Sequence, residues 1–149
     1  MQKYYNEHRE SIKKQLLDII LNNDPSFFEH LVVKLLLALG YGYGTDAGQV
    51  VGKSHDGGID GIINEDKLGL DKIYIQAKRY ASSHNVGCKE IQAFSGAMKK
   101  VTKGVFITTS SFTKEARKEV LEQVGKQIVL IDGTLLTDLM LRSGIGVRC

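Results

Sequence analysis

The sequence predicts an α/β fold in which a mixed β-sheet carries helices on both faces. The chain has 149 residues, 42% hydrophobic and 25% charged, which is the size and composition of one globular domain. Amphipathic helical patterns alternate with short β-branched runs. Their order is a helix, three strands, a helix and a strand, followed by a further helix, strand and helix, and this order is typical of a sheet packed between helices.

The first two helices are predicted from apolar spacing and from helix-end residues. Apolar side chains recur at helical spacing over 3–21. Asp24 and Pro25 are typical of a second helix start, as the N-cap and first-turn residues, and Gly40 is the expected C-cap. Because 31–39 is apolar on nearly every side, we expect this second helix to be buried.

The remaining elements follow a glycine-rich loop. NEDKLGLD, with its polar residues and glycine, is typical of a hairpin loop. No linker or low-complexity segment divides the chain, so we expect an N-terminal helical extension over 1–24 and a single domain over 25–149. The predicted elements are strands near 49–52, 59–63, 72–78, 104–109 and 127–131, and helices near 89–102, 112–124 and 134–142.

Positive charge is concentrated in the middle of the chain. The net charge is +3, but 72–118 holds ten of the 20 Lys and Arg residues and only two acidic ones. This segment predicts a polyanion partner, with Arg79, Lys99 and Lys100 as DNA contacts. A solvated lysine-rich helix surface explains the charge equally well.

Cysteine usage and hydropathy predict a cytoplasmic protein. Cys88 and Cys149 lie far apart and form neither a CxxC pair nor a disulfide framework, which suits a reducing compartment. No apolar run approaches the roughly 18 residues of a membrane span, so we expect no membrane partner.

Three side chains are expected to meet at the strand 72–78. Strand alternation puts Gln76 and Lys78 on one face of the sheet and the isoleucines of IYIQAK on the other. Asp60 begins the preceding strand, where hairpin pairing brings its carboxylate to the same side, and its flanking glycines allow close approach of a ligand or backbone. The alternative for Lys78 is a solvated lysine at a strand end.

Glu29 lies on the apolar face of the second helix, so its carboxylate needs a partner. A metal ion is one candidate; a capping role in the first helical turn is the other. With Asp60 and Gln76, Glu29 supplies the oxygen ligands that Mg²⁺ prefers. Lys78 is placed to orient an attacking water and to stabilise charge on a phosphate. The four residues together predict a magnesium-dependent phosphodiesterase, with Mn²⁺ as a substitute.

Several blocks of the chain resemble the catalytic domain of Mrr-type restriction endonucleases, within the PD-(D/E)xK nuclease superfamily. The resemblance covers about 25–147 and implies a restriction-endonuclease-like fold with an αβββαβ core. The blocks are FFEHLVVKLLLALGYG, DGGIDGIINEDKLGLDKIYIQAKRY, EIQAFSGAM, GVFITTSSFTKEA and IVLIDGTLL.

The resemblance implies a role for each site residue. Asp60 corresponds to the metal-ligating aspartate and Gln76 to the second acidic position, which the Mrr branch often fills with glutamine. Lys78 corresponds to the catalytic lysine, and Glu29 to a helix glutamate of related nucleases. Gln92 falls on the following helix, either beside the scissile phosphate or as an exposed helix glutamine.

The function predicted from these residues is that of a magnesium-dependent DNA endonuclease acting in restriction of foreign DNA, methylated DNA included. The resemblance implies a two-part design with an N-terminal winged-helix module, for which 1–24 is too short. The expectation is therefore either a fragment of a longer protein, with a DNA-recognition domain as partner, or a stand-alone nuclease. A homo-oligomer is also expected. One alternative is a catalytically inactive DNA-binding or assembly domain on the same fold, but the retention of Asp60 and Lys78 disfavours it. The other is a small-molecule α/β enzyme, which is disfavoured because no cofactor loop or nucleophile stands in the right context.

Overall fold

The computed structural model describes residues 2–51 and 59–145. Within these ranges the chain forms five helices and five strands, in the order predicted from the sequence. The elements are α1 (Gln2–Leu21), α2 (Pro25–Ala38), β1 (Gly48–Val50), β2 (Gly61–Asn64), β3 (Lys72–Lys78), α3 (Cys88–Met98), β4 (Lys103–Thr108), α4 (Lys114–Glu122), β5 (Gln127–Ile131) and α5 (Gly133–Ser143).

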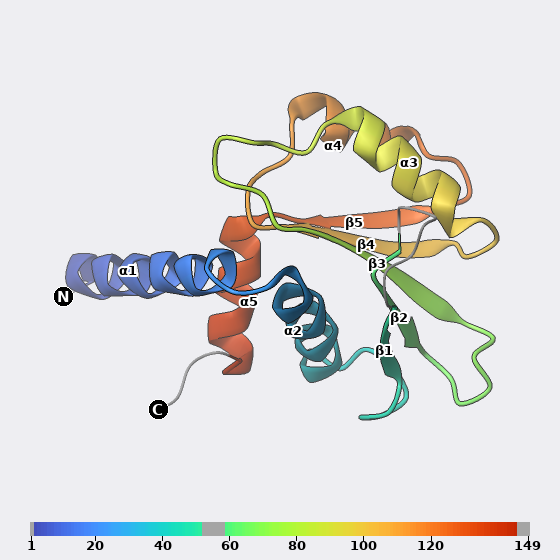
Figure 1. Ribbon diagram of the computed structural model, residues 1–149, viewed down its shortest axis with the longest axis horizontal. Coiled ribbons are helices and arrows are strands. Elements are labelled where there is room, and N and C mark those ends of the chain that lie inside the picture. Colours follow the sequence, from blue (N-terminus) through green and yellow to red (C-terminus); the bar gives the residue numbers. More distant parts are fainter. Residues whose placement is uncertain (1, 52–58, 146–149) are drawn as a thin grey trace.

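The strands form a single mixed sheet in the order β1-β2-β3-β4-β5 (Figure 1). β1, β2 and β3 are antiparallel neighbours, as the predicted hairpin requires, whereas β3, β4 and β5 run parallel. Ile75 of β3 pairs with Gly61 of β2 and with Val105 of β4. β3 is therefore the central strand, and it joins the antiparallel part of the sheet to the parallel part.

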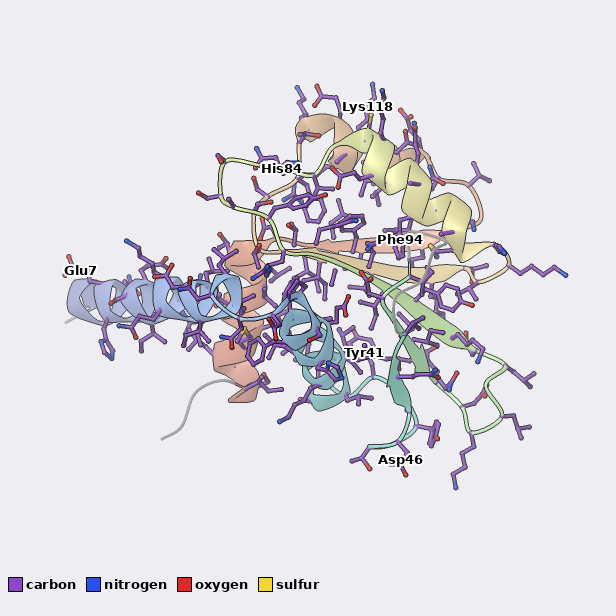
Figure 2. The ribbon with its side chains drawn as sticks, viewed as in Figure 1. Glu7, Tyr41, Asp46, His84, Phe94 and Lys118 are labelled. Atoms are coloured by element: carbon purple, nitrogen blue, oxygen red, sulfur yellow. The ribbon has the colours of Figure 1, made fainter. Side chains whose placement is uncertain are left out.

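Helices cover both faces of the sheet, as predicted. α1, α2 and α5 lie on one side and α3 and α4 on the other (Figure 1). Ile73 and Ile75 of β3 belong to the core under α2 and α5, whereas Tyr74 packs against the core under α3 and α4. Phe94 points from α3 toward the sheet (Figure 2), where its ring meets Phe106 of β4 edge to face. Strand alternation thus separates two apolar cores.

α1 packs on α5 near the end of the chain. Leu16 and Ile20 are buried in the same core as α2 and α5. Asp138 of α5 accepts from Arg9 of α1 and pairs with Arg142, and these contacts, led by the hydrogen bond from Arg9, lower the pKa of its carboxyl. No helix in the described ranges is long and apolar enough to cross a membrane.

Some helix ends differ from the predicted ones. α3 ends at Met98 rather than near 102, because Lys99 adopts a positive φ of 54° and turns the chain into β4. α4 is likewise shorter than predicted at both ends. Asp24 takes the predicted N-cap position of α2, but its side chain makes no capping hydrogen bond. Leu39 is the C-cap of α2, and Gly40 follows it with φ 102°.

Candidate active site

Asp60 is fixed at the start of β2 by the neighbouring strand. Its backbone N–H donates to the Ile75 carbonyl at 2.7 Å. Its Oδ2 accepts from Gln76 Nε2 at 2.6 Å and from the Ala77 backbone N–H at 2.8 Å. The hairpin therefore brings Asp60 and Gln76 together, as the strand pattern indicated. Gln76 is only 4% exposed, so its carboxamide is an interior group that points at the aspartate.

Two glycines let α2 approach β1 and β2 closely. A Cβ on Gly61 would lie 2.9 Å from a methyl of Val33, and one on Gly48 would lie 2.6 Å from the other methyl. The Val33 side chain therefore packs α2 directly against these strands. Glu29 precedes Val33 by four residues, on the same helix face, and Asp60 precedes Gly61. This packing places the Glu29 carboxyl beside Asp60.

The pKa of Glu29 reports this proximity. It is raised above its ordinary value first by partial burial, which disfavours the charged form, and then by the negative charge of Asp60. A hydrogen-bonding interaction with Asp60 acts in the same direction. Two carboxyl groups from different elements thus face each other, and a cation between them would relieve their repulsion.

Lys78 ends β3 on the Gln76 face of the strand, opposite Thr108 of β4. Its side chain is half-buried, and no hydrogen-bond or ion-pair partner for its ammonium is found in the described part of the chain. Lys78 lies two residues after Gln76, so the two residues share a face of β3. An ammonium on the same strand face as Gln76 is suited to a phosphate-containing ligand.

The donor set fits a hard divalent cation. Glu29 and Asp60 supply two carboxylates, and the Gln76 carboxamide supplies a neutral oxygen. Within 2–51 and 59–145 no three His, Cys, Asp or Glu side chains cluster, so a soft-metal or zinc-type ligand set is absent from these ranges. Mg²⁺ needs few protein ligands because it keeps several waters. Gly57 and Gly58, among the glycines expected to allow close approach to Asp60, lie outside the described residues.

The four predicted DNA contacts occupy different surroundings. Gln92 is exposed on α3 and donates to Glu119 at 2.8 Å. Lys99 and Lys100 are exposed in the turn after α3, before the amino end of β4. Arg79 follows Lys78 directly, but its guanidinium donates to backbone carbonyls at the end of α1 and beyond. The structure does not gather these side chains around Asp60 as one group.

Residues 20–140 match a family of catalytic domains described as restriction endonuclease. The chain is 46% identical, over 143 residues, to the type IV methyl-directed restriction enzyme EcoKMrr of Escherichia coli strain K12. The match covers 95% of this chain and 46% of that relative, so the chain spans about half the length of the curated relative.

Two solved structures share the fold. The DNA modification-dependent restriction endonuclease AspBHI superposes with a TM-score of 0.72 and 23% identity, over 91% of this chain and 36% of its own. The restriction endonuclease MspJI, solved in complex with a 27-mer oligonucleotide, gives a TM-score of 0.64 and 20% identity, over 90% of this chain and 31% of its own. At these identities the likeness shows the fold alone.

Proposed function

Because this chain belongs to the Mrr-type restriction endonuclease family, we propose that it is a DNA endonuclease domain that hydrolyses phosphodiester bonds with Mg²⁺, Mn²⁺ serving as a substitute. The observation that carries the proposal is the convergence on Asp60. Gln76 and the Ala77 amide donate to its carboxylate, and Glu29 of α2 lies against it. Restriction endonucleases generally use a divalent metal ion, and this donor set suits one.

Each site residue has a chemical task in this proposal. Asp60, Glu29 and Gln76 would hold the metal ion, which lowers the pKa of a bound water and neutralises charge on the phosphate. The two donors to Oδ2 of Asp60 fix the direction of its carboxylate, and Oδ1 would be the oxygen that ligates the metal ion. Lys78 orients the attacking water and stabilises the negative charge that develops on the phosphate oxygens.

We propose restriction of foreign DNA as the role of the domain, with methylated DNA as the substrate class that the name of the methyl-directed relative suggests. The site residues bind metal and phosphate, and none of them reads a base edge. Selection of a target would then rest on a DNA-recognition domain beside this one. A homo-oligomeric state is a further part of the proposal.

The experiment measures cleavage of supercoiled plasmid with and without Mg²⁺. We expect nicked and linear products only with the metal, and a loss of roughly 10²–10³-fold in rate for Lys78→Ala, because the lysine acts on developing charge. Lys67→Ala, in the exposed hairpin loop, is the matched control and should cut like the parent. Asp60→Ala should abolish the rise in melting temperature that Mn²⁺ produces in the parent.

Two outcomes would contradict the proposal. A Lys78→Ala protein that cuts at the parental rate would remove the lysine from the chemistry. A parent that binds duplex DNA but never cuts it, with either metal, would favour the inactive DNA-binding domain that the same fold can provide.

A further inference from the structure

Arg79 carries two hydrogen bonds that span most of the N-terminal half of the chain. Its Nη1 donates to the Leu21 carbonyl at 2.8 Å and to the Asn23 carbonyl at 2.5 Å. Leu21 is the last residue of α1, and Asn23 lies in the short connection to α2. Carbonyls at a helix end have no partner within the helix, so the guanidinium satisfies groups that would otherwise need water. In Figure 1 the end of α1 lies beside the carboxyl end of β3.

The same connection leads directly into the helix that carries Glu29. Pro25 begins α2, and Glu29 follows within its first two turns. Asp60 and Gln76 are already joined to each other by the β2–β3 pairing and by a side-chain hydrogen bond. Glu29 comes from a different element, and its carboxyl faces the Asp60 carboxyl, so electrostatic repulsion opposes its place in the site. Holding this end of α2 against β3 therefore matters for assembling the metal ligands.

We infer that Arg79 is a positioning residue that ties the strand carrying Gln76 and Lys78 to the start of α2, and so holds Glu29 at the metal site, rather than a direct DNA contact. This inference rests on the metal site proposed above. Arginine suits the task because its rigid, planar guanidinium directs both N–H groups of Nη1 at the two carbonyls, whereas a lysine ammonium is a single flexible point charge. Both acceptors are main-chain carbonyls, so the contact depends on the backbone path of the connection and not on its side chains.

The first test follows metal binding and DNA binding separately in Arg79→Ala, Arg79→Lys and the parent. Metal binding is read from the rise in melting temperature on titration with Mn²⁺ alone. We expect Arg79→Ala to raise the half-saturating Mn²⁺ concentration roughly tenfold or more, as loss of a residue that orients ligands does. Arg79→Lys should fall between the two, because it keeps the charge but loses the planar group that directs both N–H groups. Arg142→Ala, an exposed arginine on α5, is the control and should leave the titration unchanged.

DNA binding is measured by fluorescence anisotropy with a labelled duplex in EDTA at several salt concentrations. A positioning role predicts parental affinity and a parental salt slope for Arg79→Ala. A phosphate contact instead predicts weaker binding, a slope reduced by about 0.9, and rescue by Arg79→Lys. That second pattern, with an unchanged Mn²⁺ titration, would overturn the inference.

Hydrogen exchange of the metal-free proteins supplies a readout that needs neither metal nor DNA. Arg79→Ala should speed exchange in the first turns of α2, where Phe27 N–H bonds the Asp24 carbonyl at 2.9 Å, while β4 keeps its parental protection. Unchanged exchange in α2 would also overturn the inference. If the parent cuts no DNA, the proposed function fails while this measurement still decides the role of Arg79. If Arg79→Ala does not fold, the Mn²⁺ titration, the DNA-binding measurement and the hydrogen exchange are made on Arg79→Lys instead.

Discussion

At the scale of the residue, Gln76 gives Asp60 a hydrogen bond that a glutamate at this position could not give. A carboxamide offers both a donor and an acceptor, whereas a carboxylate offers only acceptors. Nε2 donates to Asp60 at 2.6 Å, which leaves Oε1 as the atom able to ligate a metal ion. A glutamate at this position would add a third carboxylate next to Asp60 and Glu29 and would remove a hydrogen bond from Asp60.

Substitution of Gln76 should therefore separate metal affinity from metal-free stability. Gln76→Glu should lower the Mg²⁺ concentration needed for cleavage by roughly tenfold, because charge on the ligands tunes affinity. The same change should lower the melting temperature in EDTA, by about 2–4 °C for each kcal/mol of added repulsion in a chain of this size. Gln76→Leu keeps the bulk but loses both polar atoms, so cleavage should fall severely at limiting Mg²⁺.

Gln49 provides the matched control for charge, since it is exposed on β1. Gln49→Glu should leave the Mg²⁺ dependence unchanged. It should change the free energy of unfolding by no more than a few tenths of a kcal/mol, so the melting temperature should stay close to that of the parent. If Gln76→Leu cuts as well as the parent at limiting Mg²⁺, Gln76 is not a ligand. Plasmid cleavage across a Mg²⁺ titration, paired with thermal melts in EDTA, measures both effects.

The contacts that the sequence could predict are the ones that follow from local periodicity. Alternation in β3 put Gln76 and Lys78 on one face, and the hairpin put Asp60 across from Gln76. The Arg79 contact could not be predicted in this way, because its acceptors are backbone carbonyls 56 and 58 residues away. The sequence suggests that an arginine next to the proposed catalytic lysine contacts phosphate. Only the structure shows that carbonyls at the end of α1 and just beyond it lie within its reach.

At the scale of the element, the position of α2 depends on the absence of two side chains beneath it. Val33 packs where Gly48 and Gly61 leave room, and Glu29 lies one turn earlier on the same helix face. The sequence indicated that glycines next to Asp60 permit close approach. It could not indicate that a helix, as well as a ligand, uses the space. Glu29 can therefore lie beside Asp60 only because α2 packs closely on these strands.

Gly61→Ala should displace α2 and weaken metal binding. The added Cβ would lie 2.9 Å from Val33 Cγ2, closer than Cβ contacts in real proteins, and a valine methyl has little freedom to move away. Overpacking of this kind costs about 1–3 kcal/mol. We expect a lower melting temperature and a half-saturating Mn²⁺ concentration raised roughly tenfold.

A double substitution tests whether the clash is the cause. Val33→Ala removes the methyls, so adding it to Gly61→Ala should restore part of the metal affinity, with a coupling of about 0.5–3 kcal/mol. Gly96→Ala, where a Cβ would meet nothing within 4 Å, is the control and should leave metal binding unchanged. Additive losses in the double variant would show that α2 is not seated by this contact.

The ends of the elements show where sequence patterns stop being informative. β3 and β5 have the predicted bounds because β-branched runs and flanking turn residues mark both ends. α3 ends four residues early because Lys99 takes a positive φ, for which lysine has no intrinsic preference. Lys126 stabilises this turn by donating to the Lys99 carbonyl at 2.7 Å, a contact 27 residues apart that local patterns do not contain.

At the scale of the whole molecule, the basic segment does not form one uniform surface. Several of its cations are engaged: Lys72 donates to Asn64, Lys103 pairs with Glu65 and Asp71, and Arg117 pairs with Asp132. The hydrogen bond from Lys103 lowers the pKa of Asp71, and the hydrogen bonds to Glu65 and then to Asp71 raise the pKa of Lys103. Charge counted along the sequence therefore overstates the charge available to DNA, and the exposed lysines outside these pairs are the better candidates.

Lys99 and Lys100 are two such lysines, and their position defines the last prediction. Ile73 pairs with Lys103 and Lys78 with Thr108, so the turn before β4 lies at least five residues, or about 16 Å, from Lys78 along the strands. A duplex that contacts both points would lie along the sheet. Reversing Lys99 and Lys100 to Glu should then weaken binding to every sequence alike and reduce the salt slope by about two, without changing the Mn²⁺ titration.

The control for this reversal changes net charge by the same amount elsewhere. Lys34 and Lys67 are exposed and lie outside the basic segment, so Lys34→Glu with Lys67→Glu should weaken binding only slightly through the long-range field. Anisotropy titrations of one labelled duplex at several salt concentrations compare both pairs with the parent. Equal losses would mean that DNA responds to net charge alone. An unchanged slope after reversal of Lys99 and Lys100 would place the DNA away from this turn, toward the carboxyl ends of β3 and β4 where Lys78 lies.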